Sequence, residues 1–243
     1  MTDAYTQNEM MTIAAARRLA DGTVCFVGIG LPSLAANLAR ATHAPKCVLI
    51  YESGPIGAKP TMPPLSIGDG ELSETADLTV SVPEMFAYWL QGGRIDVGFL
   101  SAAQIDRNGN LNSTVIGEYE HPTVRLPGAG GAPEIATSCR DVFVMLRQSP
   151  RTFVETLDFL TSVGSRVRVV VTDLGILEPD THGELELTRV HPGVSVEQAR
   201  VATGWDLKIA DEIDETAPPT AAELTALRAL ARKDGELRAS PTD

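Results

Sequence analysis

One glutamate, Glu52, stands where a reacting carboxylate is expected in this sequence. It follows the apolar run 47–51 and precedes Ser53-Gly54, which is a turn signal. Ligands of open parallel sheets bind beyond the carboxyl ends of the strands, so a carboxylate here can act as a base or as a covalent nucleophile. The alternative is a polar residue that only meets solvent where the strand stops.

Two glycine-containing segments can place backbone N–H groups against a ligand. The first, Gly28-Ile-Gly-Leu-Pro-Ser33, lies between an apolar run and a helical stretch but lacks the third glycine of a dinucleotide fingerprint. A tight strand-to-helix turn is the alternative interpretation. The second, Leu126-Pro-Gly-Ala-Gly-Gly-Ala132, can present N–H groups to an oxyanion or a thioester carbonyl, or it can be a flexible crossover.

Three amide side chains, Gln104, Asn110 and Asn112, flank a turn signature at 106–109. Amides suit the recognition of carboxylates or carbonyls because they donate hydrogen bonds without adding charge. A hairpin turn with solvated amides is the alternative. The sequence has no HExxH, G-x-S-x-G or CxxC motif, so zinc-enzyme and serine-hydrolase chemistry are disfavoured and we predict no metal site.

The elements that must position these residues alternate between strand and helix. Short apolar runs that lack strict alternation are typical of strands covered on both faces. These runs are residues 24–29, 47–51, 78–82, 96–100, 142–145 and 167–172. Helical stretches lie between several of them, for example at 34–40 and 83–91. The pattern predicts an α/β fold with an open, mostly parallel sheet flanked by helices.

Capping boxes predict a helix near each end of the chain, one starting at Thr6-x-x-Glu9 and one at Thr220-x-x-Glu223. The acidic segment 211–219 ends in Pro-Pro and is predicted to be a linker or a surface loop. We therefore place one domain at residues 1–210 and an acidic linker with a C-terminal helix and tail at residues 211–243.

The composition narrows the class of protein. The chain has 243 residues, of which 43% are hydrophobic, and its formal net charge of −12 disfavours binding to nucleic acid. No apolar run approaches the roughly 20 residues that span a bilayer, and the first residues lack a signal-peptide pattern, so no membrane association is predicted. The three cysteines, Cys25, Cys47 and Cys139, fit reduced thiols and a cytoplasmic location.

Taken together and in this order, these segments resemble the β (B) subunit of the family I CoA-transferases, in the glutaconate and 3-oxoadipate CoA-transferase branch. The resemblance runs from about residue 5 to residue 205. It is carried by residues 27–32, 52–54, 98–106, 109–112, 128–131 and 171–175, and it is extended by residues 191–194 and 203–205.

The resemblance implies that Glu52 is the nucleophile of a ping-pong exchange through a glutamyl-CoA thioester. It also implies that backbone N–H groups at Ile29, Gly30, Gly130 and Gly131 bind the thioester oxyanion. A carboxylate is a weak nucleophile, but proximity to a bound thioester raises its reactivity, and donors aimed at the oxyanion stabilise the transition state.

The substrates implied are an acyl-CoA, with succinyl-CoA as the donor, and a dicarboxylic or 3-oxo acid such as 3-oxoadipate. Coenzyme A thioester is then a substrate, and no tightly bound cofactor is predicted. Gln104, Asn110 and Asn112 are predicted to bind the substrate. Four cations in or near these loops can meet a second carboxylate or can be plain surface charges: Lys59, Arg94, Arg107 and Arg125.

The resemblance also implies a partner, the CoA-transferase α subunit, in an α2β2 or larger assembly. Coenzyme A carries several phosphate charges, whereas this chain is acidic, so the α subunit or a local loop is expected to bring most of the positive charge. Two other functions stay open. One is an acyl-CoA hydrolase on the same scaffold, and the other is a nucleotide-binding module without catalysis.

Overall fold

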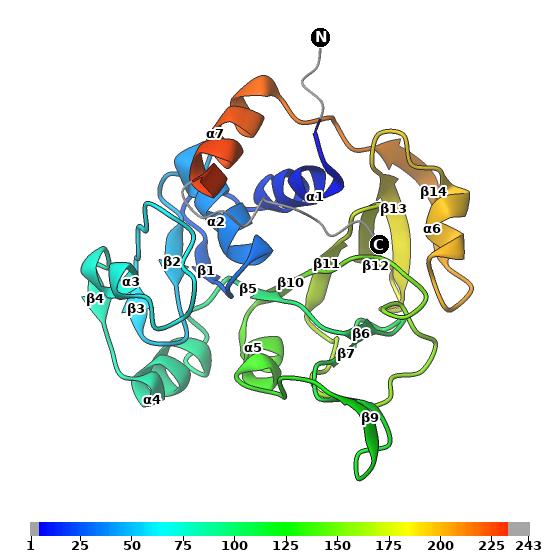
Figure 1. Cartoon of the computed structure of the whole chain (residues 1–243), viewed down its shortest axis with the longest axis horizontal. Coiled ribbons are helices and arrows are strands. Elements are labelled where there is room, and N and C mark those ends of the chain that lie inside the picture. The colour runs from blue at the N-terminus through cyan, green and yellow to red at the C-terminus, as the bar shows by residue number, and fades with distance from the viewer. Residues whose placement is uncertain (1–4, 233–243) are drawn as a thin grey trace.

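The computed structural model describes residues 5–232, and its centre is a parallel sheet (Figure 1). Five adjacent strands are parallel to one another: β2 (Val48–Ile50), β1 (Val24–Phe26), β5 (Val97–Leu100), β10 (Asp141–Met145) and β11 (Val167–Val171). Each corresponds to one of the apolar runs, so the prediction of an α/β fold with a mostly parallel sheet is confirmed. The carboxyl ends of these strands meet at one edge.

Further strands, which include both antiparallel and parallel pairings, extend this centre on both sides to a sheet of ten strands. On one side lie β12 (Gly175–Pro179), β13 (Leu185–Val190) and β14 (Lys208–Glu215); on the other lie β3 (Pro55–Ile56) and β4 (Leu78–Thr79). The complete order is β14-β13-β12-β11-β10-β5-β1-β2-β3-β4. Two small hairpins stand outside the sheet: β6 (Gln104–Ile105) with β7 (Leu111–Asn112), and β8 (Val115–Gly117) with β9 (Pro122–Arg125).

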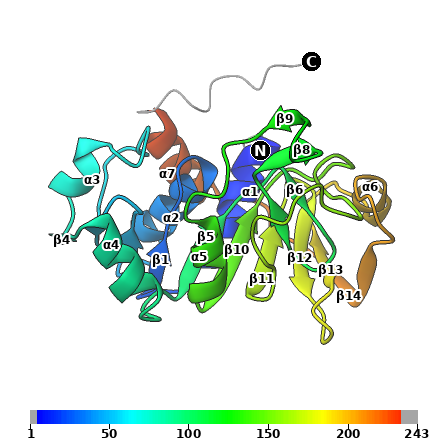
Figure 2. The ribbon, with the colours of Figure 1, turned by 90° about the horizontal axis from the view of Figure 1, so that it is seen from below.

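Helices cover both faces of the sheet, as Figures 1 and 2 show. One face carries α1 (Gln7–Ala16), α2 (Leu31–Ala41) and α7 (Ala221–Arg232). The other carries α5 (Ala132–Ser138), α4 (Val82–Glu84) and the π-helical turn η1 (Met85–Leu90) that continues α4. Two short helices lie beside the ends of the sheet, α3 (Gly70–Glu74) and α6 (Val196–Val201). Across residues 5–232, no helix is both long and apolar enough to cross a membrane.

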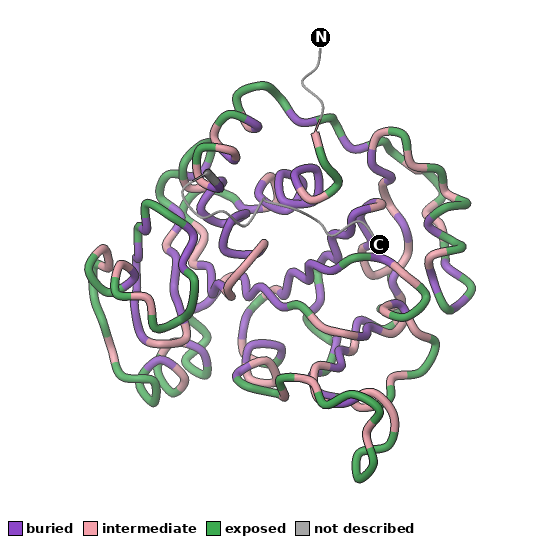
Figure 3. The backbone as a smooth tube through the Cα atoms, viewed as in Figure 1, coloured by how far each residue is buried: buried purple, intermediate pink, exposed green. Residues whose placement is uncertain are grey.

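The strands send alternate side chains into two separate cores. Leu49 and Tyr51 pack in the core under α1, α2 and α7, whereas Ile50 packs in the core under α5 and η1. Most residues of the central strands are buried, as the purple tube at the centre of Figure 3 shows. Burial on both faces explains why these runs are almost continuously apolar.

Both predicted capping boxes are formed. The N–H of Glu9 donates to Thr6 Oγ1 at 3.1 Å and the N–H of Thr6 donates to Glu9 Oε2 at 2.8 Å, and Thr220 makes the equivalent pair of bonds with Glu223. The same two carboxylates also link the first helix to the last, because Glu223 forms an ion pair with Arg17 and Glu9 forms one with Arg228.

The predicted linker differs from the structure. Residues 211–215 belong to β14, which pairs in parallel with β13 at the end of the sheet. The strand is at an edge and largely exposed, so acidic side chains are tolerated on it and its sequence is not apolar. The predicted strand 78–82 is also shorter, because Ser81 caps the helix that begins at Val82.

The C-terminal helix shares the core of α1 and α2, where Leu224 and Leu227 are buried. The division of the chain at residue 210 stays a prediction. The tail predicted for residues 234–243 lies outside the described residues.

Replacement of Glu223 by Gln is expected to make the free energy of unfolding less dependent on pH in the acidic range. Two hydrogen bonds of 2.7 Å from Arg17 lower the pKa of the Glu223 carboxyl from its ordinary 4.5 to about 2. A pKa that is lower in the folded state contributes stability above pH 4.5, and this contribution is lost as the pH falls towards 2. Urea unfolding between pH 7 and pH 2.5 measures this effect. Compared with the wild type, E223Q is expected to have a lower free energy of unfolding at pH 7, and that free energy is expected to decline less steeply below about pH 4.5.

The control for this prediction is Glu212→Gln, which removes an exposed carboxylate from the edge strand β14. It is expected to leave the acid decline unchanged. A decline in E223Q as steep as that of the wild type would contradict a stabilising role for the pair of Arg17 with Glu223.

Candidate active site

Glu52 lies in a tight turn at the carboxyl end of β2. The N–H of Gly54 donates to the carbonyl of Tyr51 at 3.0 Å, and the N–H of Tyr51 donates to the carbonyl of Pro55 at 3.0 Å. Gly54 has a φ of +117°, and a Cβ at this position would lie 2.0 Å from the carbonyl oxygen of Val80. Only glycine fits this turn, which therefore fixes the backbone of Glu52 where the strand ends.

The turn faces a cavity of about 310 Å³ at the edge formed by the parallel strands. Three adjacent strands deliver residues to this cavity from their carboxyl ends: Gly28 and Ile29 after β1, Glu52 after β2, and Ser101 after β5. The glycine-rich segment from Pro127 to Gly131 lines another side of it. The structure thus brings together four segments that are distant in sequence.

Gly131 lies against the carboxylate of Glu52. A Cβ added to Gly131 would be 3.1 Å from Glu52 Oε1 and 2.8 Å from Phe86 Cζ. The φ of Gly131 is −84°, which any residue can adopt, so the lack of space and not the backbone conformation requires glycine here. The backbone of this segment therefore approaches the carboxylate more closely than any other residue type would allow.

Three of the four backbone groups predicted to bind an oxyanion line the cavity. They belong to Ile29, Gly130 and Gly131, and within residues 5–232 none of their N–H groups donates a hydrogen bond. Gly30 is not among the lining residues; it is the N-cap of α2, with a φ of +81°. The turn at Gly30 connects β1 to α2, which is the strand-to-helix turn given above as the alternative interpretation of this segment. Ile29, which directly precedes Gly30, lines the cavity.

The walls of the cavity are mostly apolar, with Phe26, Ile67 and Phe99 among them. Apart from Glu52, Ser101 supplies the one polar side chain among the described residues that line it, and no Lys, Arg or His is in that group. An apolar wall lowers the local dielectric constant and strengthens the electrostatic effect of each donor inside. The lack of a cation means that these described residues cannot balance the charge of an anionic ligand.

The predicted substrate-binding amides lie outside this cavity. Gln104 and Asn112 are buried in the hairpin of β6 and β7, where Asn112 Nδ2 donates to Gln104 Oε1 at 2.7 Å and Gln104 Nε2 donates to Asp158 at 2.6 Å. Asn110 bonds Asp106 within the turn. These hydrogen bonds account for the amides as hairpin residues, and a role in substrate binding stays a prediction.

The four candidate cations are likewise engaged elsewhere. Lys59 pairs with Asp77, and Arg107 pairs with Glu155 at 3.3 Å. The guanidinium groups of the other two lie over aromatic rings, Arg94 over Trp89 at 5.8 Å and Arg125 over Tyr119 at 5.1 Å from the ring centroid. None of the four lines the cavity of Glu52.

Two residues at the site were not predicted from the sequence. Ser101 directly follows the apolar run 96–100, which is the same signal that singled out Glu52, and it could have been found in this way. Phe86 lies on η1 and does not line the cavity, but its ring is so near Gly131 that a Cβ there would be 2.8 Å from Phe86 Cζ. No pattern in the sequence predicts that contact, because the two residues come from different elements.

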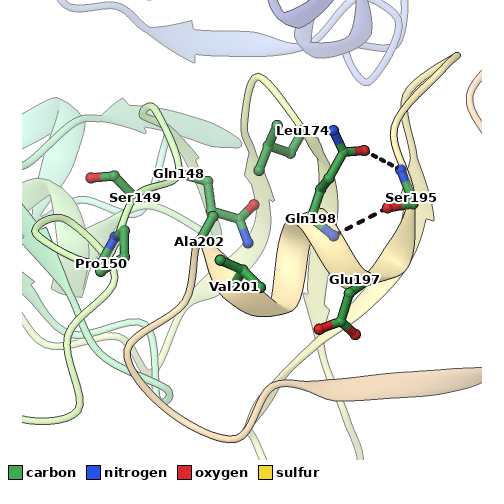
Figure 4. Close-up of a pocket in the computed structure, with 9 residues that line it drawn as sticks. All are labelled: Gln148, Ser149, Pro150, Leu174, Ser195, Glu197, Gln198, Val201 and Ala202. Atoms are coloured by element: carbon green, nitrogen blue, oxygen red, sulfur yellow. Dashed lines mark hydrogen bonds between the residues drawn. The ribbon is translucent and has the colours of Figure 1, made fainter.

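A second cavity, of about 500 Å³, lies between the segments that follow β10 and β11 and the short helix α6 (Figure 4). Gln148 lines it, but the side chain of Gln148 is bound to Thr172, Thr203 and the carbonyl of Ala199. Gln198 and Ser195, which Figure 4 shows bonded to each other, form the capping box of α6. The side chains of Gln148, Gln198 and Ser195 therefore form hydrogen bonds within the protein that stabilise the fold. The cavity that contains Glu52 is the stronger candidate for an active site.

A carboxylate that lies against a glycine backbone, with free N–H groups in the same apolar cavity, is suited to attack on an acyl group. The parallel sheet and this site therefore define an α/β enzyme of acyl-group chemistry. Residues 8–202 match the Coenzyme A transferase family, and the chain belongs to this family.

Relatives of known function agree with this membership. The B subunit of the 3-oxoadipate CoA-transferase of Pseudomonas knackmussii is 61% identical over 93% of this chain and 94% of its own length. The B subunit of the glutaconate CoA-transferase of Acidaminococcus fermentans is 34% identical over 89% of each chain. The crystal structure of glutaconate coenzyme A-transferase from Acidaminococcus fermentans superimposes with a TM-score of 0.87, covering 94% of this chain and 95% of the other. The resemblance to family I CoA-transferase β subunits is thereby confirmed.

Proposed function

We propose that this chain is the β subunit of a CoA-transferase that moves coenzyme A from succinyl-CoA to 3-oxoadipate, with Glu52 as the covalent nucleophile. The observation that carries the mechanism is that the Glu52 carboxylate lies so near Gly131 that a Cβ on Gly131 would be 3.1 Å from Glu52 Oε1. The same cavity is lined by Ile29, Gly130 and Gly131, whose N–H groups donate no hydrogen bond within residues 5–232. The 61% identity to the subunit of a 3-oxoadipate CoA-transferase supports the choice of substrate.

The exchange begins when a carboxylate oxygen of Glu52 attacks the thioester carbonyl of the donor. The carbon–sulfur bond breaks, coenzyme A leaves as its thiolate, and an acyl-glutamyl anhydride forms. The thiolate then attacks the glutamyl carbonyl of the anhydride, which releases the donor acid as a carboxylate and leaves a glutamyl-CoA thioester. The acceptor carboxylate reverses these steps and restores the Glu52 carboxylate.

The backbone of the cavity assists each attack. The N–H groups of Ile29, Gly130 and Gly131 are available to the oxyanion of the tetrahedral intermediate. One well-placed donor of this kind contributes about 3 kcal/mol to the stability of a transition state. The glycines also let the thioester approach the carboxylate, which converts a weak nucleophile into an effective one through proximity.

The polyanionic part of coenzyme A needs positive charge from outside this cavity. The described residues that line the cavity include no cation, and the net charge of the chain is −12. We propose that a separate CoA-transferase α subunit supplies this charge in an α2β2 or larger complex. The two relatives from Pseudomonas knackmussii and Acidaminococcus fermentans are themselves named as B subunits, which supports a second subunit.

An acyl-CoA hydrolase is the second candidate. The cholesterol ring-cleaving hydrolase IpdB subunit of Mycobacterium tuberculosis is 25% identical to this chain, which supports the idea that a hydrolase can use this scaffold. A decarboxylase, AibA/AibB, also has this fold with a TM-score of 0.86. The apolar cavity favours transfer because it offers few groups to hold a reacting water. A nucleotide-binding module without catalysis is disfavoured by the placement of Glu52.

Trapping of the covalent intermediate tests the proposal. The reconstituted two-subunit enzyme, mixed with succinyl-CoA and then treated with borohydride, is expected to carry a reduced glutamyl residue at position 52. The physical reason is that the thioester carbonyl is reduced whereas a free carboxylate is not. Mass spectrometry of the peptide that contains Glu52 measures the change, and succinate in place of succinyl-CoA is the control.

Acceptor dependence separates transfer from hydrolysis. Loss of the succinyl-CoA thioester is expected to be fast only when 3-oxoadipate is added, and the product is expected to be 3-oxoadipyl-CoA. Thioester loss at the same rate without an acceptor would favour the hydrolase. An unmodified Glu52 peptide after borohydride treatment would rule out the covalent step.

A further inference from the structure

Three polar side chains form a buried cluster behind the active-site turn. Tyr51 is completely buried, and its hydroxyl lies 3.0 Å from Ser33 Oγ. Asn37 Nδ2 donates to the carbonyl of Ser33 at 2.9 Å and to the Tyr51 hydroxyl at 3.3 Å. All three residues are at most 1% exposed, and they lie in a core that is otherwise built mainly of alanine and aliphatic side chains.

This cluster joins the two segments that supply the reacting groups. Tyr51 directly precedes Glu52 at the end of β2. Ser33 lies in the first turn of α2, four residues after Ile29. The N–H of Leu34 donates to the carbonyl of Gly30 at 3.0 Å, so the first turn of the helix is rigidly connected to the loop that carries Ile29.

We propose that Tyr51 is a positioning residue whose hydroxyl, held by Ser33 and Asn37, sets the distance between the Glu52 carboxylate and the N–H of Ile29. The proposal rests on the function proposed for Glu52. Tyr51 does not line the cavity, so it acts on the reaction through the backbone of its neighbour and not by contact with the substrate.

The physical basis is the cost of an unpaired buried polar group. A buried hydroxyl that loses its partner is destabilised, whereas the paired hydroxyls favour one arrangement of β2 relative to α2. Burial raises the pKa of Tyr51, which favours the neutral hydroxyl that makes these hydrogen bonds. An apolar contact at the same place would also pack the two elements together, but it lacks the directional preference of a hydrogen bond.

Tyr51→Phe in the reconstituted two-subunit enzyme tests the proposal. The variant removes one oxygen atom from the core and keeps the ring. We expect kcat for CoA exchange to fall about tenfold while KM for succinyl-CoA stays within a factor of two, because a small misplacement of reacting groups affects the transition state most. The rate of formation of the trapped glutamyl thioester is expected to fall by the same factor.

Thr12→Val is the matched control. Thr12 is 1% exposed on α1, and its hydroxyl makes no hydrogen bond within the described residues. This variant also removes a buried hydroxyl next to the same core, so it reports the effect of altered packing alone. We expect it to leave kcat and KM unchanged.

Ser33→Ala provides a second route to the same contact if Tyr51→Phe folds poorly. It is expected to lower kcat with KM unchanged, and the double variant S33A/Y51F is expected to lose no more than the worse single variant because both remove one interaction. A wild-type kcat in either single variant, or losses that multiply in the double variant, would overturn the proposal. Failure of the proposed function is recognised separately, because Glu52→Gln would then keep its exchange activity.

Discussion

Replacement of Glu52 by Gln is expected to reduce CoA exchange below detection while acyl-CoA binding stays close to that of the wild type. The amide has nearly the shape of the carboxylate but carries no nucleophilic oxygen of comparable strength, so neither the anhydride nor the thioester can form. Loss of covalent catalysis of this kind lowers the rate by many orders of magnitude. Exchange between succinyl-CoA and 3-oxoadipate in the two-subunit enzyme, together with calorimetric binding of succinyl-CoA, measures both effects.

Glu134→Gln is the matched control for this change. Glu134 is the third residue after Gly131, in the first turn of α5, but it accepts a hydrogen bond from Ser138 and does not line the cavity. The same chemical change at this nearby position is expected to leave exchange near the wild-type rate. Residual exchange in E52Q above that of a preparation without the β subunit would show that Glu52 is not the nucleophile.

Replacement of Gly131 by Ala is expected to lower kcat/KM about 100-fold, in keeping with the effect of a displacement of about 1 Å on a reacting group. The added methyl group would lie 3.1 Å from Glu52 Oε1 and 2.8 Å from Phe86 Cζ, so the carboxylate or the ring must move. Alanine adopts the φ of −84° without strain, so the cost to stability is limited to the movement of the carboxylate or the ring, and the melting temperature is expected to change far less than the activity. Steady-state kinetics and thermal unfolding of the two-subunit enzyme test the two expectations.

Gly28→Ala is the control for this steric argument. Gly28 lines the same cavity, but a Cβ there meets no atom within 4 Å and no left-handed φ is required. We expect a clearly smaller loss of kcat/KM than in G131A. Equal losses in the two variants would mean that any methyl group in the cavity is harmful and that the contact of Gly131 with Glu52 has no special role.

Local patterns predicted the parts of this protein that depend on neighbouring residues. Thr6 with Glu9 and Thr220 with Glu223 form their capping boxes because cap and partner are three residues apart. The five parallel strands were evident because burial on both faces requires apolar runs. Glu52 was recognised because it directly follows such a run and precedes a turn.

Long-range packing decided what these patterns left open. The sequence alone drew attention to Gln104 and Asn112 as polar groups, but hydrogen bonds to each other and to Asp158 hold them in a hairpin away from Glu52. The acidic segment 211–215 resembles a linker, and only pairing with β13 makes it a strand.

The sequence by itself thus determined the α/β class, the family and the position of Glu52, since each depends on short runs and local motifs. The tertiary structure alone decided which groups surround Glu52. Gly131 is 79 residues away along the chain, and Ser101 is 49 residues away, yet both line its cavity. Such contacts depend on the order of strands in the sheet and on the space left between elements, and neither property is encoded in any single stretch of residues.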